Sequence, residues 1–101
     1  MKTREDLINL GIEGFKADEI MTLQSRMLEQ AVKFQFRKKD NSIRDAVGTL
    51  KRELMKQEDG TLWEPKGESK PEPATIVRFF DCEKGLWRCF TATEFIGIVE
   101  G

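Results

Sequence analysis

The fold is decided by a stretch that reads Val32-Lys-Phe-Gln-Phe-Arg37, then Lys38-Lys-Asp-Asn-Ser42, then Ile43-Arg-Asp-Ala-Val-Gly-Thr-Leu50. In its first six residues apolar and polar side chains alternate, which is the pattern of a strand with one buried face. The middle residues have turn chemistry, and Asn41 tolerates the left-handed backbone of a tight hairpin. We therefore predict a β-hairpin here, with Gly48 marking a bulge or a sharp bend in its second strand.

A second hairpin is predicted from Thr75 to Thr91, with its turn at Glu83-Lys84-Gly85. Its first strand is rich in β-branched and aromatic residues, which favour extended structure. With Lys84 and Gly85 at the tip, Asp81 is expected opposite Arg88, so the two side chains form a cross-strand ion pair. Phe95 to Val99 is predicted as a short fifth strand that closes a barrel against the first.

Two helices are predicted before the strands. Thr3 and Asp6 have the spacing of a capping box, and a short helix follows from Arg4 to Leu10. A second helix is expected to begin near Asp18, which is a good N-cap residue. Its apolar face consists of Ile20, Leu23, Met27, Leu28 and Ala31. A face with this spacing is expected to pack on the barrel.

The chain of 101 residues suits one compact domain. We predict an N-terminal helical segment over residues 1–31 and a small β-barrel over residues 32–101, with a long loop over residues 51–74. The fold class is α+β, mainly β: a five-stranded barrel with an N-terminal helical cap. A loop of this length is either functional or mobile. Its Trp63 is predicted to pin the loop to the core, the alternative being an exposed binding anchor.

The composition excludes several kinds of active site. Histidine and tyrosine are absent, so the commonest general base and the usual Ser/His/Asp and Cys/His pairs are missing. Cys82 and Cys89 alone cannot complete a zinc site of the Cys/His type, and we expect buried or half-buried thiols. We predict no catalytic residue, no metal ion and no cofactor. No apolar run suits a membrane span or a signal peptide, so the expected location is the cytoplasm.

Positive charge is concentrated on the first hairpin. The formal net charge is −1, yet residues 33–52 contain seven basic side chains against only Asp40 and Asp45. Such a patch attracts the phosphates of RNA or DNA. The candidate binding residues are Lys33, Arg37, Lys38, Lys39 and Arg44. The alternative is a solvated hairpin whose lysines protect an exposed edge from aggregation.

The two hairpins together resemble a known family. The motifs are the lysine-rich turn before Ile43-Arg44, the exit Gly48-Thr-Leu50, and Asp81 followed by Trp87-Arg-Cys-Phe90. From Val32 to Val99, without the loop, they are similar to the WYL-related domain family in its small stand-alone branch from bacteria and phages. The resemblance implies an Sm-like or Src-homology-3-like barrel. In larger regulators of this kind the barrel senses a small ligand or nucleic acid through aromatic and basic residues.

This sequence departs from those larger regulators at two places. The Trp-Tyr-Leu tripeptide is absent, since Ile76-Val-Arg-Phe79 stands at that strand. Glu94 stands where the regulators carry a basic residue. Ligand sensing of the regulator type is therefore not expected from the resemblance.

Taken together, the sequence predicts a non-enzymatic binding module, nucleic-acid-associated or regulatory, that uses the basic first hairpin. The alternative is a protein-interaction or structural accessory module, associated with a phage or mobile element and working as a homodimer. Its interaction anchors would be Met27, on the helix from Asp18 to Ala31, and Trp63. A third interpretation is a small-ligand pocket between the barrel and the helix.

Overall fold

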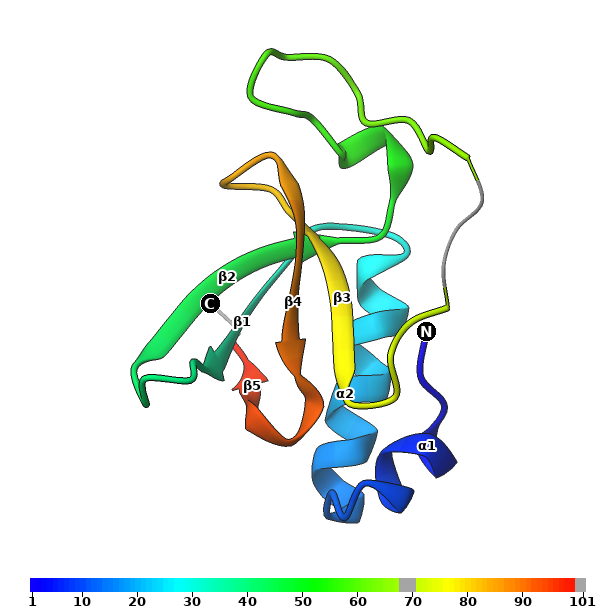
Figure 1. Ribbon diagram of the computed structural model, residues 1–101, viewed down its shortest axis with the longest axis vertical. Coiled ribbons are helices and arrows are strands. Elements are labelled where there is room, and N and C mark those ends of the chain that lie inside the picture. The colour runs from blue at the N-terminus through cyan, green and yellow to red at the C-terminus, as the bar shows by residue number, and fades with distance from the viewer. Residues whose placement is uncertain (68–70, 100–101) are drawn as a thin grey trace.

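Five antiparallel strands form one curled sheet in the order β4-β3-β2-β1-β5 (Figure 1). The computed structural model describes residues 1–67 and 71–99, so residues 68–70 of the predicted loop and 100–101 of the predicted barrel domain lie outside the described residues. The strands are β1 (Val32–Arg37), β2 (Ile43–Thr49), β3 (Ile76–Asp81), β4 (Leu86–Thr91) and β5 (Phe95–Ile98). The α+β, mainly β class is confirmed.

The barrel is open along one side. As predicted, β5 pairs antiparallel with β1. Within the described residues no pairing joins β4 to β5, so these two strands are the edges of the sheet. The α2 helix lies along one side of the strands, and the chain that follows β2 rises above the turn between β3 and β4 (Figure 1).

The first hairpin forms as predicted. β1 and β2 pair without interruption from Val32 opposite Gly48 to Arg37 opposite Ile43. Asn41 has a positive φ of 72°, and the Lys38 N–H donates to the Ser42 carbonyl over 2.8 Å. Side chains along β1 alternate between buried and exposed, because one face of the strand covers the core.

Gly48 marks no bulge, because the register between β1 and β2 is continuous there. It is the residue at which β2 pairs with both neighbours, Val32 on β1 and Asp81 on β3. A Cβ atom at this position would lie 2.7 Å from Phe79 Cδ2 and 3.0 Å from Phe34 Cε1. Glycine is needed because the core aromatic rings pack directly on the backbone.

The second hairpin has a different register from the predicted one. Asp81 pairs with Leu86, and Arg88 pairs with Phe79, because residues 82–85 all belong to the turn. Asp81 shapes this turn: its Oδ1 accepts the N–H of Glu83 over 2.9 Å, and its carbonyl accepts the N–H of Gly85 over 2.8 Å. The predicted ion pair between Asp81 and Arg88 is therefore wrong.

The helices are α1 (Arg4–Asn9) and α2 (Gly14–Met27). The predicted capping box is confirmed, with both reciprocal hydrogen bonds between Thr3 and Asp6. The predicted start of the second helix near Asp18 is wrong, because α2 begins earlier and Glu13 is its N-cap residue. Asp18 lies inside the helix, where its carboxylate forms an ion pair with Arg4 over 2.7 Å.

The apolar face of α2 packs on the open barrel as predicted, but it is shorter than expected. Ile20, Leu23 and Met27 are fully buried in the core. Leu28 and Ala31 follow the helix and are exposed, so their predicted place on the packed face is wrong. Because Met27 is 0% exposed, it cannot serve as an interaction anchor on the surface of this fold.

Phenylalanine rings fill the centre of the barrel. The ring of Phe34 lies edge-on to Phe79 with centroids 5.0 Å apart. Phe90 stacks on Phe36 at 5.3 Å and on Phe95 at 5.7 Å. These rings come from β1, β3, β4 and the start of β5. The contact of Phe90 with Phe95 therefore links the two edge strands, which are not paired by backbone hydrogen bonds among the described residues.

Candidate functional site

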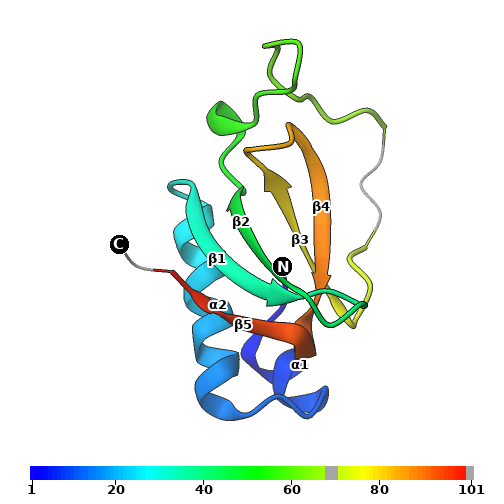
Figure 2. The same cartoon turned by 90° about the vertical axis from the view of Figure 1, so that its left-hand side faces the viewer.

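In Figure 2 the first hairpin, formed by β1 and β2, lies beside the hairpin of β3 and β4. A cleft of about 450 Å³ is lined by residues from the tip of the first hairpin and from the strands β3 and β4. Five of its lining residues are basic: Arg37, Lys38, Lys39, Arg44 and Arg88. Among the described residues, no carboxylate lines this cleft. Phe36 and Phe90 form an apolar floor but are only 6% and 3% exposed, so they offer little ring surface to a ligand. We call this site the basic cleft.

The local fold explains why these side chains meet. Arg37 ends β1, and Lys38 and Lys39 enter the turn, so all three are exposed at the tip of the hairpin. Arg88 lies on β4, whose second edge has no strand partner among the described residues. Arg44 lies opposite Phe36, on the face of β2 that points into the barrel. The cleft therefore joins residues that are far apart in the sequence.

Arg44 differs from the other cations because it is paired. Its Nη2 lies 2.6 Å from Oδ2 of Asp81, whose side chain is fully buried, whereas the Arg44 side chain keeps 18% exposure. This pair ties the first hairpin to the end of β3. In the part of the chain that the structure describes, the side chains of Arg37, Lys39 and Arg88 have no ion-pair partner. These three charges are thus available to an anionic ligand.

Of the predicted binding residues, four line the basic cleft and one does not. Lys33 is exposed but pairs with Val47 at the other end of β1, and it does not line the cleft. Arg88 was missed by sequence reasoning. No local signal points to it, because its place beside the hairpin tip depends on how the two hairpins cross.

Asp40 is the acid of the hairpin turn. Hydrogen bonds from the Ser42 hydroxyl and the Ser42 N–H, together with the charge of Lys38, lower the pKa of this carboxyl below its usual value. Asp40 is therefore ionised at neutral pH. Its carboxylate is engaged by Ser42 and does not line the basic cleft.

The chain after β2 covers the outer face of the second hairpin. A short 3-10 helix (Arg52–Leu54) is followed by a β-bridge between Lys56 and Leu62. The Trp63 N–H then donates to the Met55 carbonyl over 2.8 Å. The indole of Trp63 contacts that of Trp87 on β4, with centroids 5.3 Å apart at 71°. Trp63 therefore attaches the loop to the outer face of the sheet, not to the central core.

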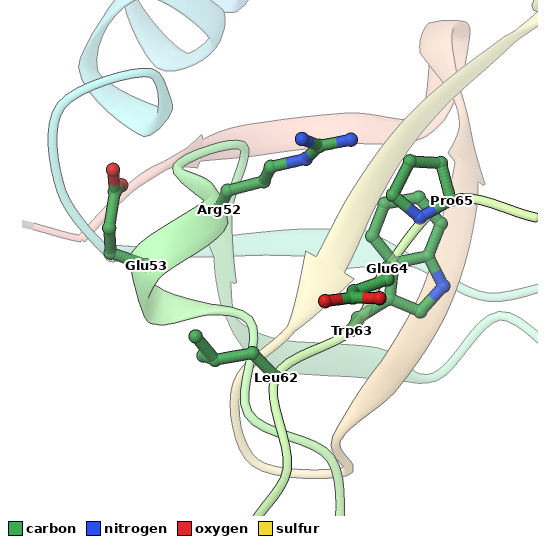
Figure 3. A pocket seen from close by; sticks show the side chains of 6 residues that line it. All are labelled: Arg52, Glu53, Leu62, Trp63, Glu64 and Pro65. Carbon is green, nitrogen blue, oxygen red and sulfur yellow. The ribbon is translucent and has the colours of Figure 1, made fainter.

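Trp63 also lines a cleft of about 380 Å³ beside the 3-10 helix (Figure 3). The charged residues that share this cleft are Arg52, Glu53 and Glu64. Charges of both signs are mixed there, so this cleft has no preference for an anion.

The cysteines are both unpaired thiols. Cys82 is half-buried as predicted, whereas Cys89 is exposed, because it lies on the outer face of the edge strand β4. Burial, and then the charges of Asp81 and Glu83, raise the pKa of the Cys82 thiol, so it is protonated at neutral pH. Within residues 1–67 and 71–99, no group of three Cys, Asp or Glu side chains lies close enough together to hold a metal ion.

Comparison with known families decides the classification. The model of the WYL_2 family, described as an Sm-like SH3 beta-barrel fold, matches residues 20–96. The chain belongs to the WYL_2 family. The match confirms the resemblance that the two hairpins carry, and it covers the whole WYL_2 sheet up to the start of β5. No curated protein and no solved structure matches the chain.

Proposed function

We propose that this WYL_2 domain is a non-enzymatic binding module that holds single-stranded RNA or DNA by its phosphates in the basic cleft. The observation that carries the proposal is the convergence of five basic side chains on one concave site that no described carboxylate lines. Lysine and arginine side chains bind phosphates by neutralising them and releasing their counterions. A concave groove of this kind suits the backbone of a single strand.

Because the overall charge is slightly negative, any affinity for a polyanion depends on the local charge of the basic cleft. The chain has a formal net charge of −1 and a pI near 5.6, so the molecule as a whole does not attract a polyanion. Affinity has to come from the few cations of the cleft. We therefore expect binding that is weakened strongly by salt.

The lining of the cleft supports binding in place of catalysis. Apart from the cations, the cleft is lined by phenylalanine, isoleucine, threonine and Cys89. The chain contains no histidine, which is the commonest general base. The domain is thus proposed to hold its ligand without transforming it. A cytoplasmic location stays a prediction, and none of the described helices is long and apolar enough to cross a membrane.

The proposal is tested by fluorescence anisotropy with labelled single-stranded RNA and DNA at low and at physiological salt. The double variant Lys38→Glu/Lys39→Glu is expected to weaken binding by roughly tenfold or more. The matched control is Lys33→Glu/Lys56→Glu, which changes the net charge equally at exposed lysines outside the cleft. Absence of binding at low salt, or an equal loss in both variants, would contradict the proposal.

Of the two interaction anchors predicted for a homodimer, Met27 is buried and Trp63 is partly exposed. Burial of Met27 removes the predicted contact on α2, and Trp63 packs on Trp87 of its own chain. Light scattering tests for a homodimer: a salt-insensitive dimer that Trp63→Ala dissociates would favour the interaction module over the nucleic-acid module.

A further inference from the structure

The outer face of the second hairpin forms a continuous track. The strand register places three pairs of residues on this face, namely Ile76 with Thr91, Arg78 with Cys89, and Phe80 with Trp87. The first pair and Cys89 line the basic cleft, whereas Arg78 and Trp87 line a second cleft of about 680 Å³. Arg78 of the second cleft and Cys89 of the basic cleft are paired across the two strands. From Thr91 to Trp87 the track is roughly 14 Å long, at about 3.4 Å per residue.

The second cleft is apolar at its centre and basic at its sides. Trp63 and Trp87 contribute indole rings, and Lys66 and Arg78 contribute cations. Glu72 is its one carboxylate among the described lining residues. Both oxygens of Glu72 are engaged, Oε1 by Lys2 Nζ over 2.9 Å and Oε2 by the Arg78 N–H over 3.0 Å. The carboxylate is thus largely neutralised and does not oppose an anionic ligand.

The two indoles are arranged as a corner. Their rings meet at 71°, and both side chains are only half-buried, so part of each ring remains open. Trp87 also has a buried Nε1 donor with no hydrogen-bond partner, which is the only such side-chain atom in the described part of the chain. Folded proteins rarely leave a buried donor unpaired, because the loss of its hydrogen bond with water is unfavourable. The indole at this position is therefore not explained by the hydrogen bonds of the fold itself.

We infer that Trp63 and Trp87 form a stacking platform for the unpaired bases of a strand whose phosphates lie in the basic cleft. The inference rests on the proposed function and extends it across the edge strand β4. Indole faces stack on any base, so the platform favours single strands without selecting a sequence. The bases of a duplex are already stacked and paired, so they do not reach the platform.

The chain allows a direct test, because it contains two tryptophans and no tyrosine. Its intrinsic fluorescence therefore reports on Trp63 and Trp87 alone. We expect a single-stranded oligothymidylate to quench this fluorescence in parallel with the anisotropy of a labelled strand. An abasic strand of equal length keeps the phosphates but lacks the bases. It is expected to bind roughly fivefold to a hundredfold more weakly, and without quenching.

Substitutions distinguish the contribution of base stacking on the platform from that of phosphate binding in the basic cleft. Trp63→Ala is expected to weaken oligothymidylate binding by roughly fivefold to a hundredfold and to leave binding of the abasic strand unchanged. Trp63→Phe keeps an aromatic face and is expected to restore most of the affinity. The control is Phe15→Ala, which removes an aromatic ring that is 66% exposed on α2, away from the track. Circular dichroism establishes that each variant is folded, and the comparison of the two strands on the wild-type chain does not depend on any variant.

Each outcome has one meaning. Equal affinity for both strands without quenching would overturn the stacking inference and leave the proposed function standing. Duplex binding as tight as single-strand binding, again without quenching, would overturn the stacking inference and also the preference for single strands in the proposed function. If neither strand binds at low salt, both the stacking platform and the proposed function are wrong.

Discussion

Arg44 and Asp81 form an ion pair that joins the two hairpins, with 2.6 Å between Nη2 and Oδ2. The second oxygen of Asp81 accepts the N–H groups of Glu83 and Lys84, which shape the turn between β3 and β4. One buried carboxylate thus sets the register of the second hairpin and holds a cation in the wall of the basic cleft. The distance between the hairpins, and with it the cleft, depends on this pair.

Removal of this carboxylate is expected to be strongly destabilising. Asp81→Ala leaves the Arg44 charge without its partner and two backbone donors unsatisfied, so the free energy of unfolding should fall by roughly 3 kcal/mol. Urea unfolding measures the change. The control is Asp18→Asn, because the ion pair of Asp18 with Arg4 is more than half exposed at both side chains. That variant should cost less than about 1 kcal/mol, and equal effects of the two substitutions would contradict this role for Asp81.

Gly48→Ala is expected to destabilise the core. The added methyl group would meet Phe79 and Phe34 within 3.0 Å, and overpacking of this kind costs about 1–3 kcal/mol. Gly14→Ala is the matched control, since it lies in the first turn of α2 and meets only the flexible end of Arg4. Thermal unfolding should therefore show a lower midpoint for the first variant only. An unchanged midpoint for Gly48→Ala would mean that the rings can move aside.

Arg88→Gln tests the cation that the sequence did not reveal. If Arg88 contacts one phosphate, the slope of log affinity against log salt should become shallower by about 0.7 for a single strand. Anisotropy titrations over a range of salt concentrations measure this slope. Arg52→Gln removes an exposed arginine outside the basic cleft and should leave the slope unchanged. Identical slopes for wild type and Arg88→Gln would exclude Arg88 from the site.

The capping box of α1 predicts a pH effect. Hydrogen bonds from the Thr3 N–H and hydroxyl lower the pKa of Asp6 below its usual 3.8, so ionised Asp6 stabilises the folded state. This contribution is fully present above the unfolded pKa and disappears as the pH falls through the lower folded pKa. Asp6→Asn should therefore be less stable than wild type at about pH 5 to 7, with the difference shrinking below about pH 4. A difference that persists unchanged at low pH would show that the charge of Asp6 is irrelevant.

The sequence predicted those features that depend on neighbours in the chain. The alternation in β1, the left-handed Asn41 and the Thr3–Asp6 capping box are local, and all are present in the structure. The register of the second hairpin was missed because the buried Asp81 shapes a longer turn, and its partner Arg44 is distant in sequence. Residue spacing alone does not reveal such a partner.

The candidate site was predicted only in part, for the same reason. Arg37, Lys38 and Lys39 are adjacent in the sequence and stay together in the cleft. The sequence indicates Lys33 by its charge alone, whereas the register places it near the far end of β1. Arg88 lines the cleft only because of the way in which the two hairpins cross. The sequence of the long loop between β2 and β3 does not indicate this arrangement.

The central claim, that the basic cleft binds single-stranded nucleic acid, is tested most directly by mapping the contact on the folded chain. Amide chemical shifts of the isotope-labelled protein are followed while a short single-stranded oligonucleotide is added at low salt. The predicted result is that the largest changes occur at Lys38, Lys39 and Arg88, and that they vanish when salt is raised. No changes there, or changes confined to the surface of α2 around Phe15, would contradict the claim.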